Sequence, residues 1–101
     1  MNAYRRGRVV EYACVRELRQ RGWWAQRTAG SHSPFDVVAW RCDGVRLIQV
    51  KSVAGGGSAT AAVRRGDRAW LWNEPPDIEG VDLETWVWDG ERFLIHSLSG
   101  T

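Results

Sequence analysis

The sequence has 101 residues, of which 44% are hydrophobic and 26% charged, and its formal net charge at pH 7 is +2. This length and balance predict a single globular domain over residues 1–101, with a modest core of its own. They exclude a bilayer-spanning helix, since no apolar run approaches the roughly 20 residues that one needs. No secretory signal is visible at the start, so we expect a cytoplasmic protein whose two cysteines, Cys14 and Cys42, are reduced and buried.

Charge is divided unevenly along the chain. Residues 1–51 carry ten basic and four acidic residues, whereas residues 52–101 carry four basic and eight acidic ones. The first half therefore predicts a surface that binds a polyanion, although a bias of the genome or of growth temperature also produces arginine-rich chains. Lys51 is the only lysine, and its compact ammonium group differs chemically from the guanidinium that the chain uses elsewhere.

The first part of the chain predicts a helix, a strand and a loop. Residues 4–21 repeat apolar side chains at helical spacing, and Gly22 follows as a residue that ends a helix. Residues 23–27 form a short strand, and residues 28–34 have the Ser, Gly and Pro content of a loop.

A second helix and two hairpins complete the predicted fold. After a flexible connection over residues 53–58, the helix begins at Ser58 or Thr60 and continues to about Asn73, before Pro75. Four further strands are marked by β-branched and aromatic residues, at 35–41, 45–51, 83–88 and 92–97. The order αβββαββ predicts an α/β fold with a mixed sheet.

The turn of the first hairpin determines which side chains face one another. Asp-Gly is a strong signal for a two-residue turn. If Asp43 and Gly44 are the turn residues, counting outward along both strands places Asp36 opposite Lys51, with Gln49 on the same face. A slip of one residue would separate these side chains.

An acid, an amide and an ammonium group at one end of a hairpin suit a divalent cation. Mg²⁺ prefers oxygen ligands, commonly one or two carboxylates with water and substrate phosphate. Asp36 supplies a carboxylate and Gln49 an amide oxygen, while Lys51 can orient or deprotonate a water. Glu11 is a further candidate, because a carboxylate on the apolar-flanked face of the first helix needs a partner.

Each of these residues also has a simpler explanation when taken alone. Asp36 can cap the start of a strand, Lys51 can be a solvated strand end, and Glu11 can form a salt bridge to Arg8 or Arg27. Their joint placement on one predicted face favours a functional site.

The order of these motifs resembles the PD-(D/E)XK nuclease superfamily, and within it the archaeal-type Holliday junction resolvases that are also found in viruses. Glu11 matches the family's helix acid, residues 34–39 match its aspartate strand, residues 47–52 match the (D/E)-x-K strand, and residues 27–33 match its Arg/Ser/Gly loop. The resemblance covers residues 4 to 52 and, beyond them, the element order alone. It implies a restriction-endonuclease-like core, with a mixed five-stranded sheet flanked by two helices.

The resemblance also implies roles. It implies Mg²⁺, for which Mn²⁺ substitutes, with four ligand positions, at Asp36, Gln49, Glu11 and Val50. Lys51 would position the attacking water, and Ser31 would assist cleavage. Arginines and loop residues are the candidate DNA contacts, although each can also be merely exposed; they are Arg5, Arg6, Arg8, Arg27, Ser31, His32 and Ser33.

Position 49 departs from the family pattern, which has Glu or Asp there. Glutamine can coordinate through its oxygen, but one negative charge is lost and metal binding should weaken. Because of Gln49, there is an alternative to an active nuclease: a DNA-binding module that has the same fold but no catalytic activity.

Seven tryptophans are many for so small a core. We expect an apolar patch on the second helix and the last hairpin, and a homodimer through this Trp-rich C-terminal half that places two sites on one four-way junction. A tryptophan-rich core and base stacking on single strands are the alternatives.

The sequence thus predicts a metal-dependent, structure-specific DNA endonuclease that resolves four-way junctions by paired phosphodiester hydrolysis. By resemblance, the products would carry a 5′-phosphate and a 3′-hydroxyl. A restriction-type or repair-type nicking endonuclease is the alternative within the enzyme class.

Overall fold

The computed structural model describes residues 3–28, 34–53, 57–72 and 77–98. Seven elements follow one another in the predicted order: α1 (Ala3–Gln20), β1 (Trp24–Arg27), β2 (Val37–Arg41), β3 (Gly44–Ser52), α2 (Ala59–Trp72), β4 (Val81–Trp88) and β5 (Phe93–Ser97). Neither helix in these ranges has the length and apolar character that crossing a membrane requires.

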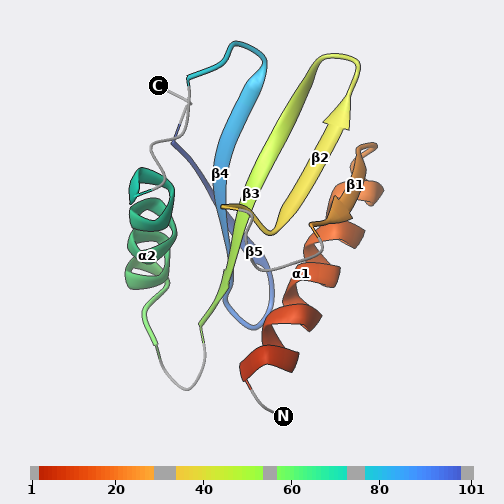
Figure 1. Cartoon of the computed structure of the whole chain (residues 1–101). Coiled ribbons are helices and arrows are strands. Elements are labelled where there is room, and N and C mark those ends of the chain that lie inside the picture. Colours follow the sequence, from red (N-terminus) through yellow and green to blue (C-terminus); the bar gives the residue numbers. More distant parts are fainter. Residues whose placement is uncertain (1–2, 29–33, 54–56, 73–76, 99–101) are drawn as a thin grey trace.

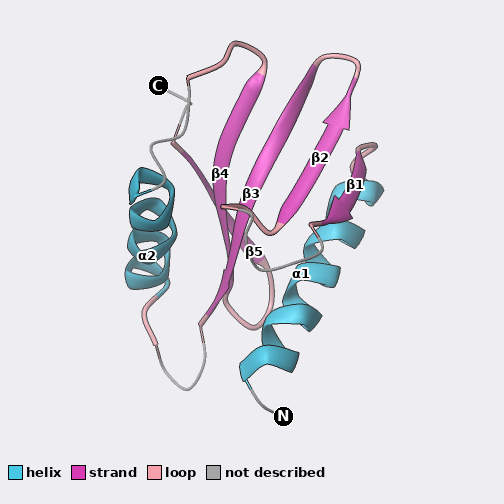
Figure 2. Ribbon diagram, in the orientation of Figure 1, coloured by secondary structure: helices cyan, strands magenta, loops and turns pink. Residues whose placement is uncertain are grey.

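The strands form one mixed sheet in the order β1-β2-β3-β4-β5. β1, β2 and β3 are antiparallel neighbours, β3 and β4 are parallel and connected through α2, and β4 and β5 are antiparallel. The two helices cover opposite faces of the sheet (Figures 1 and 2). The predicted fold class, a mixed five-stranded sheet flanked by two helices, is confirmed.

Local signals in the sequence end and begin the helices as expected. Gly22 has a φ of 90°, a conformation that favours glycine, and the N–H of Trp23 donates to the carbonyl of Leu18 at 3.0 Å. At the start of α2, the hydroxyl of Ser58 accepts the N–H of Ala61 at 3.2 Å, so Ser58 is the N-cap.

The core between α1 and the sheet is apolar and fully enclosed. Cys14, Val15 and Leu18 of α1 pack against strand residues such as Val37 and Ile48. Burial raises the pKa of the Cys14 thiol and keeps it protonated. The prediction that both thiols are buried is wrong for the second one: Cys42 lies in the turn between β2 and β3 and is exposed.

On the opposite face, α2 packs closely on β4 because it carries a glycine at the contact. Thr85 is fully buried against Gly66, and a Cβ at position 66 would lie 2.3 Å from Thr85 Cγ2. One helical turn later, Trp70 is 1% exposed, and its indole N–H donates to the carbonyl of Glu84 at 3.0 Å.

The predicted register of the first hairpin is wrong by two residues. Arg41 pairs with Gly44, so the turn residues are Cys42 and Asp43. Gly44 belongs to β3 because its missing side chain admits the Gly80 carbonyl, which would lie 3.2 Å from a Cβ there. A shift of two keeps the paired side chains of β2 and β3 on their predicted faces, since the strand repeat is also two.

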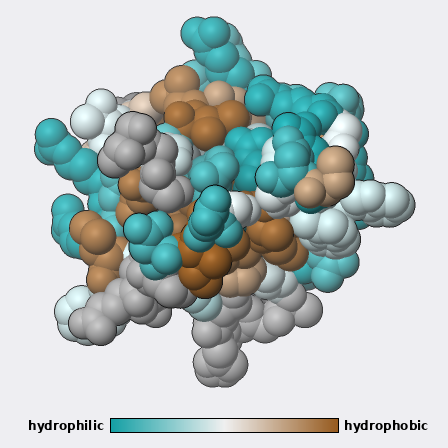
Figure 3. Space-filling view, turned by 90° about the horizontal axis from the view of Figure 1, so that it is seen from above, coloured by the Kyte–Doolittle hydropathy of each residue, from teal (hydrophilic) through white to brown (hydrophobic). Residues whose placement is uncertain are grey.

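The tryptophans divide between the core and the surface. Trp70 and Trp86 are buried, whereas Trp24 is 70% and Trp72 86% exposed. Exposed apolar side chains on α2 and the last hairpin, as predicted, include Leu71 and Leu94–Ile95. The exposure of Trp24 on β1, at the opposite edge of the sheet, was not predicted. Seen from the end of the sheet that carries the β2–β3 turn, hydrophobic areas are interspersed among hydrophilic ones (Figure 3).

Replacing Gly66 should loosen the packing of α2 on β4. Gly66→Ala places a methyl group against the fully buried Thr85, and we expect it to lower the free energy of unfolding by about 1–3 kcal/mol. Gly7→Ala is the matched control, because no atom lies within 4 Å of a Cβ there. It should raise the free energy of unfolding by roughly 0.5–1 kcal/mol, as alanine does in a helix. Urea denaturation of both variants measures the difference, and equal stability would contradict the packing.

Candidate active site

Asp36 is held at the point where the β2–β3 ladder ends. Its N–H donates to the carbonyl of Ile48 at 2.8 Å, and its carbonyl accepts the N–H of Thr28 at 3.0 Å. One carboxylate oxygen, Oδ2, accepts the N–H of Val50 at 2.9 Å. The carboxylate thus serves as the acceptor for an N–H of β3 where the neighbouring strand offers no carbonyl, as the strand-start explanation of Asp36 predicts, and the backbone anchors Asp36 on both sides.

Gln49 completes the same end of the ladder from the other strand. It is 8% exposed, and its side-chain nitrogen Nε2 donates to the carbonyl of Pro34. A carbonyl only accepts hydrogen bonds, so the atom facing Pro34 must be the nitrogen. The amide oxygen of Gln49 is therefore the atom left for coordination.

The corrected register changes the partners within the predicted cluster but not its members. Val37 pairs with Ile48, and the N–H of Asp36 donates to the carbonyl of the same Ile48. Asp36 therefore lies beside Ile48 and Val50 of β3 rather than opposite Lys51. Lys51 is the next residue after Val50, on the same face of β3 as Gln49, and is partly buried.

Glu11 approaches from α1 as an ion-paired acid. Its Oε1 accepts the Nε–H of Arg27 at 3.0 Å, and the Arg27 guanidinium stacks over the Tyr12 ring at 4.7 Å. Burial raises the pKa of Glu11, the Arg27 hydrogen bond partly lowers it, and the nearby charge of Asp36 raises it again. The two acids therefore repel each other, and the salt bridge to Arg27 that the sequence allowed is present.

The donor set fits a hard cation that keeps much of its water. No three His, Cys, Asp or Glu side chains gather as a metal-binding group among the described residues. The oxygen ligands available are the carboxylates of Asp36 and Glu11 and the amide of Gln49, and Mg²⁺ typically binds through one or two carboxylates plus waters and phosphate.

The other predicted residues are placed only in part. Arg5 and Arg8 are exposed on α1, and the N–H of Val50 donates to Asp36. The predicted loop residues Ser31, His32 and Ser33 lie outside the described residues. The side chain of Arg6 lies outside them as well.

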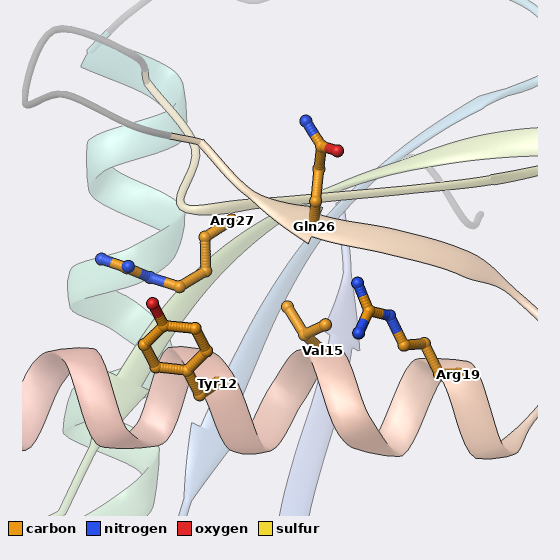
Figure 4. A pocket seen from close by; sticks show the side chains of 5 residues that line it. All are labelled: Tyr12, Val15, Arg19, Gln26 and Arg27. Carbon is orange, nitrogen blue, oxygen red and sulfur yellow. The ribbon is translucent and has the colours of Figure 1, made fainter.

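Two contacts near the site were not foreseen. Thr28 donates its hydroxyl to the carbonyl of Phe35 at 2.7 Å, which ties together the two ends of the intervening loop. Tyr12 lies beneath Arg27, as Figure 4 shows together with Val15, Arg19 and Gln26. Thr28 carried no signal in the sequence, whereas Tyr12 directly follows the candidate acid Glu11.

Comparison with known proteins identifies the fold. The structure is similar to that of Hjc from Archaeoglobus fulgidus, a Holliday junction resolvase from an archaeal hyperthermophile, with a TM-score of 0.52 and 20% sequence identity. The similarity covers 92% of this chain and 89% of that protein. The chain has the fold of Hjc. No protein-family model and no curated protein sequence matches it. The predicted resemblance is therefore confirmed at the level of the Hjc fold.

Gln49→Glu should weaken the fold when no metal is bound. A carboxylate cannot donate to the Pro34 carbonyl, and it would be charged at a nearly buried position. We expect the free energy of unfolding to fall by about 1–3 kcal/mol and to recover in part with Mg²⁺. Gln26→Glu, exposed on β1, is the control and should stay within about 0.5 kcal/mol of the parent. Urea denaturation with EDTA and with Mg²⁺ measures both, and an unchanged Gln49→Glu would contradict the contact.

Glu11→Gln should reveal the raised pKa of Glu11. The parent loses stability as pH rises from the ordinary value of 4.5 through the raised folded value, because the unfolded chain releases the proton first. The glutamine variant lacks this loss. Its free energy of unfolding, relative to the parent, should increase across that window and then level off. Metal-free denaturation from about pH 4 to pH 8 tests this, and a relative stability that falls with pH would refute it.

Proposed function

We propose that this protein is a metal-dependent, structure-specific DNA endonuclease that resolves four-way junctions. The observation that supports it is the gathering of Asp36, Gln49 and Lys51 at the end of the β2–β3 ladder in a sheet with the Hjc fold. Hjc itself is described as a Holliday junction resolvase.

In this proposal, Mg²⁺ or Mn²⁺ would be held by Asp36 and Gln49, with Glu11 and Val50 as further ligand positions. When bound, the ion would act as a Lewis acid toward the phosphate and lower the pKa of a coordinated water. Asp36 is suited to be a fixed ligand, because two hydrogen bonds hold its backbone and a third, from the Val50 N–H, orients its carboxylate. Such preorganised charge is what phosphoryl transfer requires.

Lys51 would orient the attacking water and offset negative charge that develops on the phosphate. Lys51 directly follows Val50, whose N–H donates to the Asp36 carboxylate. Ser31, from the β1–β2 connection, would assist cleavage. Arg5, Arg6, Arg8 and Arg27 would contact phosphates, together with His32 and Ser33.

A homodimer would bring two such sites onto one junction. The exposed apolar residues on the α2 side of the sheet, Leu71, Trp72 and Leu94, are the surface on which we base this proposal. A two-fold axis matches the paired, symmetric nicks that resolving a four-way junction requires.

A second candidate is a DNA-binding module without catalysis. Two observations favour it: Glu11 is already paired with Arg27, and the amide nitrogen of Gln49 is already bonded to Pro34. Both side chains therefore have structural partners that account for them without a metal.

Cleavage assays separate the two candidates. Asp36→Asn and Lys51→Ala should each reduce cleavage of a four-way junction by at least about 100-fold, while binding to the junction persists. Asp82→Asn, an exposed acid at the start of β4, is the matched control and should cleave at the parental rate. Rates are measured with Mg²⁺, with Mn²⁺ and with EDTA, on a junction and on a linear duplex.

The outcomes are distinct. Paired symmetric nicks in the junction alone, abolished by EDTA, would support the resolvase. Binding without cleavage under every metal would support the non-catalytic module. Normal cleavage by either variant would show that the site is assigned to the wrong residues.

A further inference from the structure

Three hollows follow one another along α1 toward β1. The first is lined by α1 alone, from Arg5 to Tyr12, the second lies between Tyr12 and Arg19 of α1 and the end of β1, and the third extends from Arg19 to Trp24. Neighbouring hollows share Tyr12 and then Arg19, and we call the three together the α1–β1 furrow.

The furrow is strongly basic. Four arginines line it, Arg5, Arg8, Arg19 and Arg27, in a segment whose described residues include only two glutamates. Both glutamates are engaged by arginines, Glu11 by Arg27 at 3.0 Å and Glu17 by Arg21 at 3.4 Å. A polyanion lying along this edge therefore meets cations and neutralised acids.

Aromatic rings alternate with these cations. Tyr12 is 52% exposed and Trp24 is 70% exposed, with Arg19 between them. Figure 4 shows the Arg27 guanidinium above the Tyr12 ring and Arg19 reaching toward β1 on the other side of Val15. The Arg19 guanidinium is held by two hydrogen bonds to the Ala25 carbonyl, at 2.9 and 3.2 Å. The charges and rings are thus positioned by the fold.

We propose that the α1–β1 furrow binds a single strand of DNA, with Tyr12 and Trp24 stacking on unpaired bases and the arginines contacting phosphates. Exposed rings beside a basic track are the features with which proteins hold single strands, whereas a duplex offers no free base faces. From Arg8 to Arg19 the helix rises about 16 Å, which about five nucleotides span at 3.4 Å each. Arg27, which lines the furrow, is hydrogen-bonded to Glu11, so a strand bound there would lie beside the candidate active site. The inference rests on the proposed function only in taking the nucleic acid to be DNA.

The test uses the full chain and a labelled oligothymidine of about ten nucleotides. Fluorescence anisotropy should show Trp24→Leu binding about tenfold more weakly than the parent, and Tyr12→Leu likewise. Trp24→Phe is the matched control, because it keeps a ring for stacking and should bind within about threefold of the parent. Arg19→Gln should reduce the slope of log affinity against log salt by about 0.7, whereas Arg65→Gln, exposed on α2, should leave the slope unchanged.

Two results would overturn this inference: equal binding by Trp24→Leu and Trp24→Phe, or equal salt slopes for Arg19→Gln and Arg65→Gln. Thermal melting of each variant verifies that it is folded. Failure of the furrow is distinguishable from failure of the proposed nuclease. Ring-dependent binding of the oligonucleotide without junction cleavage would refute only the enzyme, and metal-dependent junction cleavage with ring-independent binding would refute only the furrow.

Discussion

The structure depends on one buried carboxylate, that of Glu84. Its side chain is 6% exposed and accepts hydrogen bonds at 2.7–3.0 Å from the fork of Arg46, and a further one from the Trp86 indole at 2.8 Å. Its backbone carbonyl accepts the indole N–H of Trp70. One residue of β4 is thereby joined to β3 and to α2. Removing one partner of such a buried pair typically costs about 3–5 kcal/mol, because the other charge is left uncompensated. The position of β3, which carries the candidate active-site residues, follows from this arrangement.

At the far end of β3, side chains rather than backbone groups complete the hydrogen bonding. The Asp36 carboxylate accepts the N–H of Val50, and the Gln49 amide nitrogen donates to the carbonyl of Pro34. The same two residues are the proposed ligands. Stability and chemistry are therefore coupled at this point. When either residue is replaced, the stability of the variant must be measured together with its activity, so that a loss of activity can be distinguished from a loss of folding.

Local signals predicted the elements, and long-range contacts determined how they meet. Helical spacing, Gly22 and Ser58 located the helices to within one or two residues, since these signals act over a single turn. The predicted hairpin register was wrong because Gly44 is part of β3 and not of the turn. It packs against the carbonyl of Gly80, more than thirty residues away, which also accepts the N–H of Val45. The burial of Cys42 was wrong for a related reason, because the shifted turn places that residue at its tip.

The sequence by itself determined the element order and the shared face of Gln49 and Lys51, because strand alternation is a property of each strand alone and survives a shift of two residues. Only the tertiary structure decided that Asp36 meets Ile48 and Val50 rather than Lys51. It also decided that Glu11 is paired with Arg27, and that Arg46 and Glu84 form the buried ion pair. Those contacts join residues far apart in the chain, and their partners are chosen by how α1 and β4 pack on the sheet. Packing also brought the arginines of α1 beside the rings of Tyr12 and Trp24.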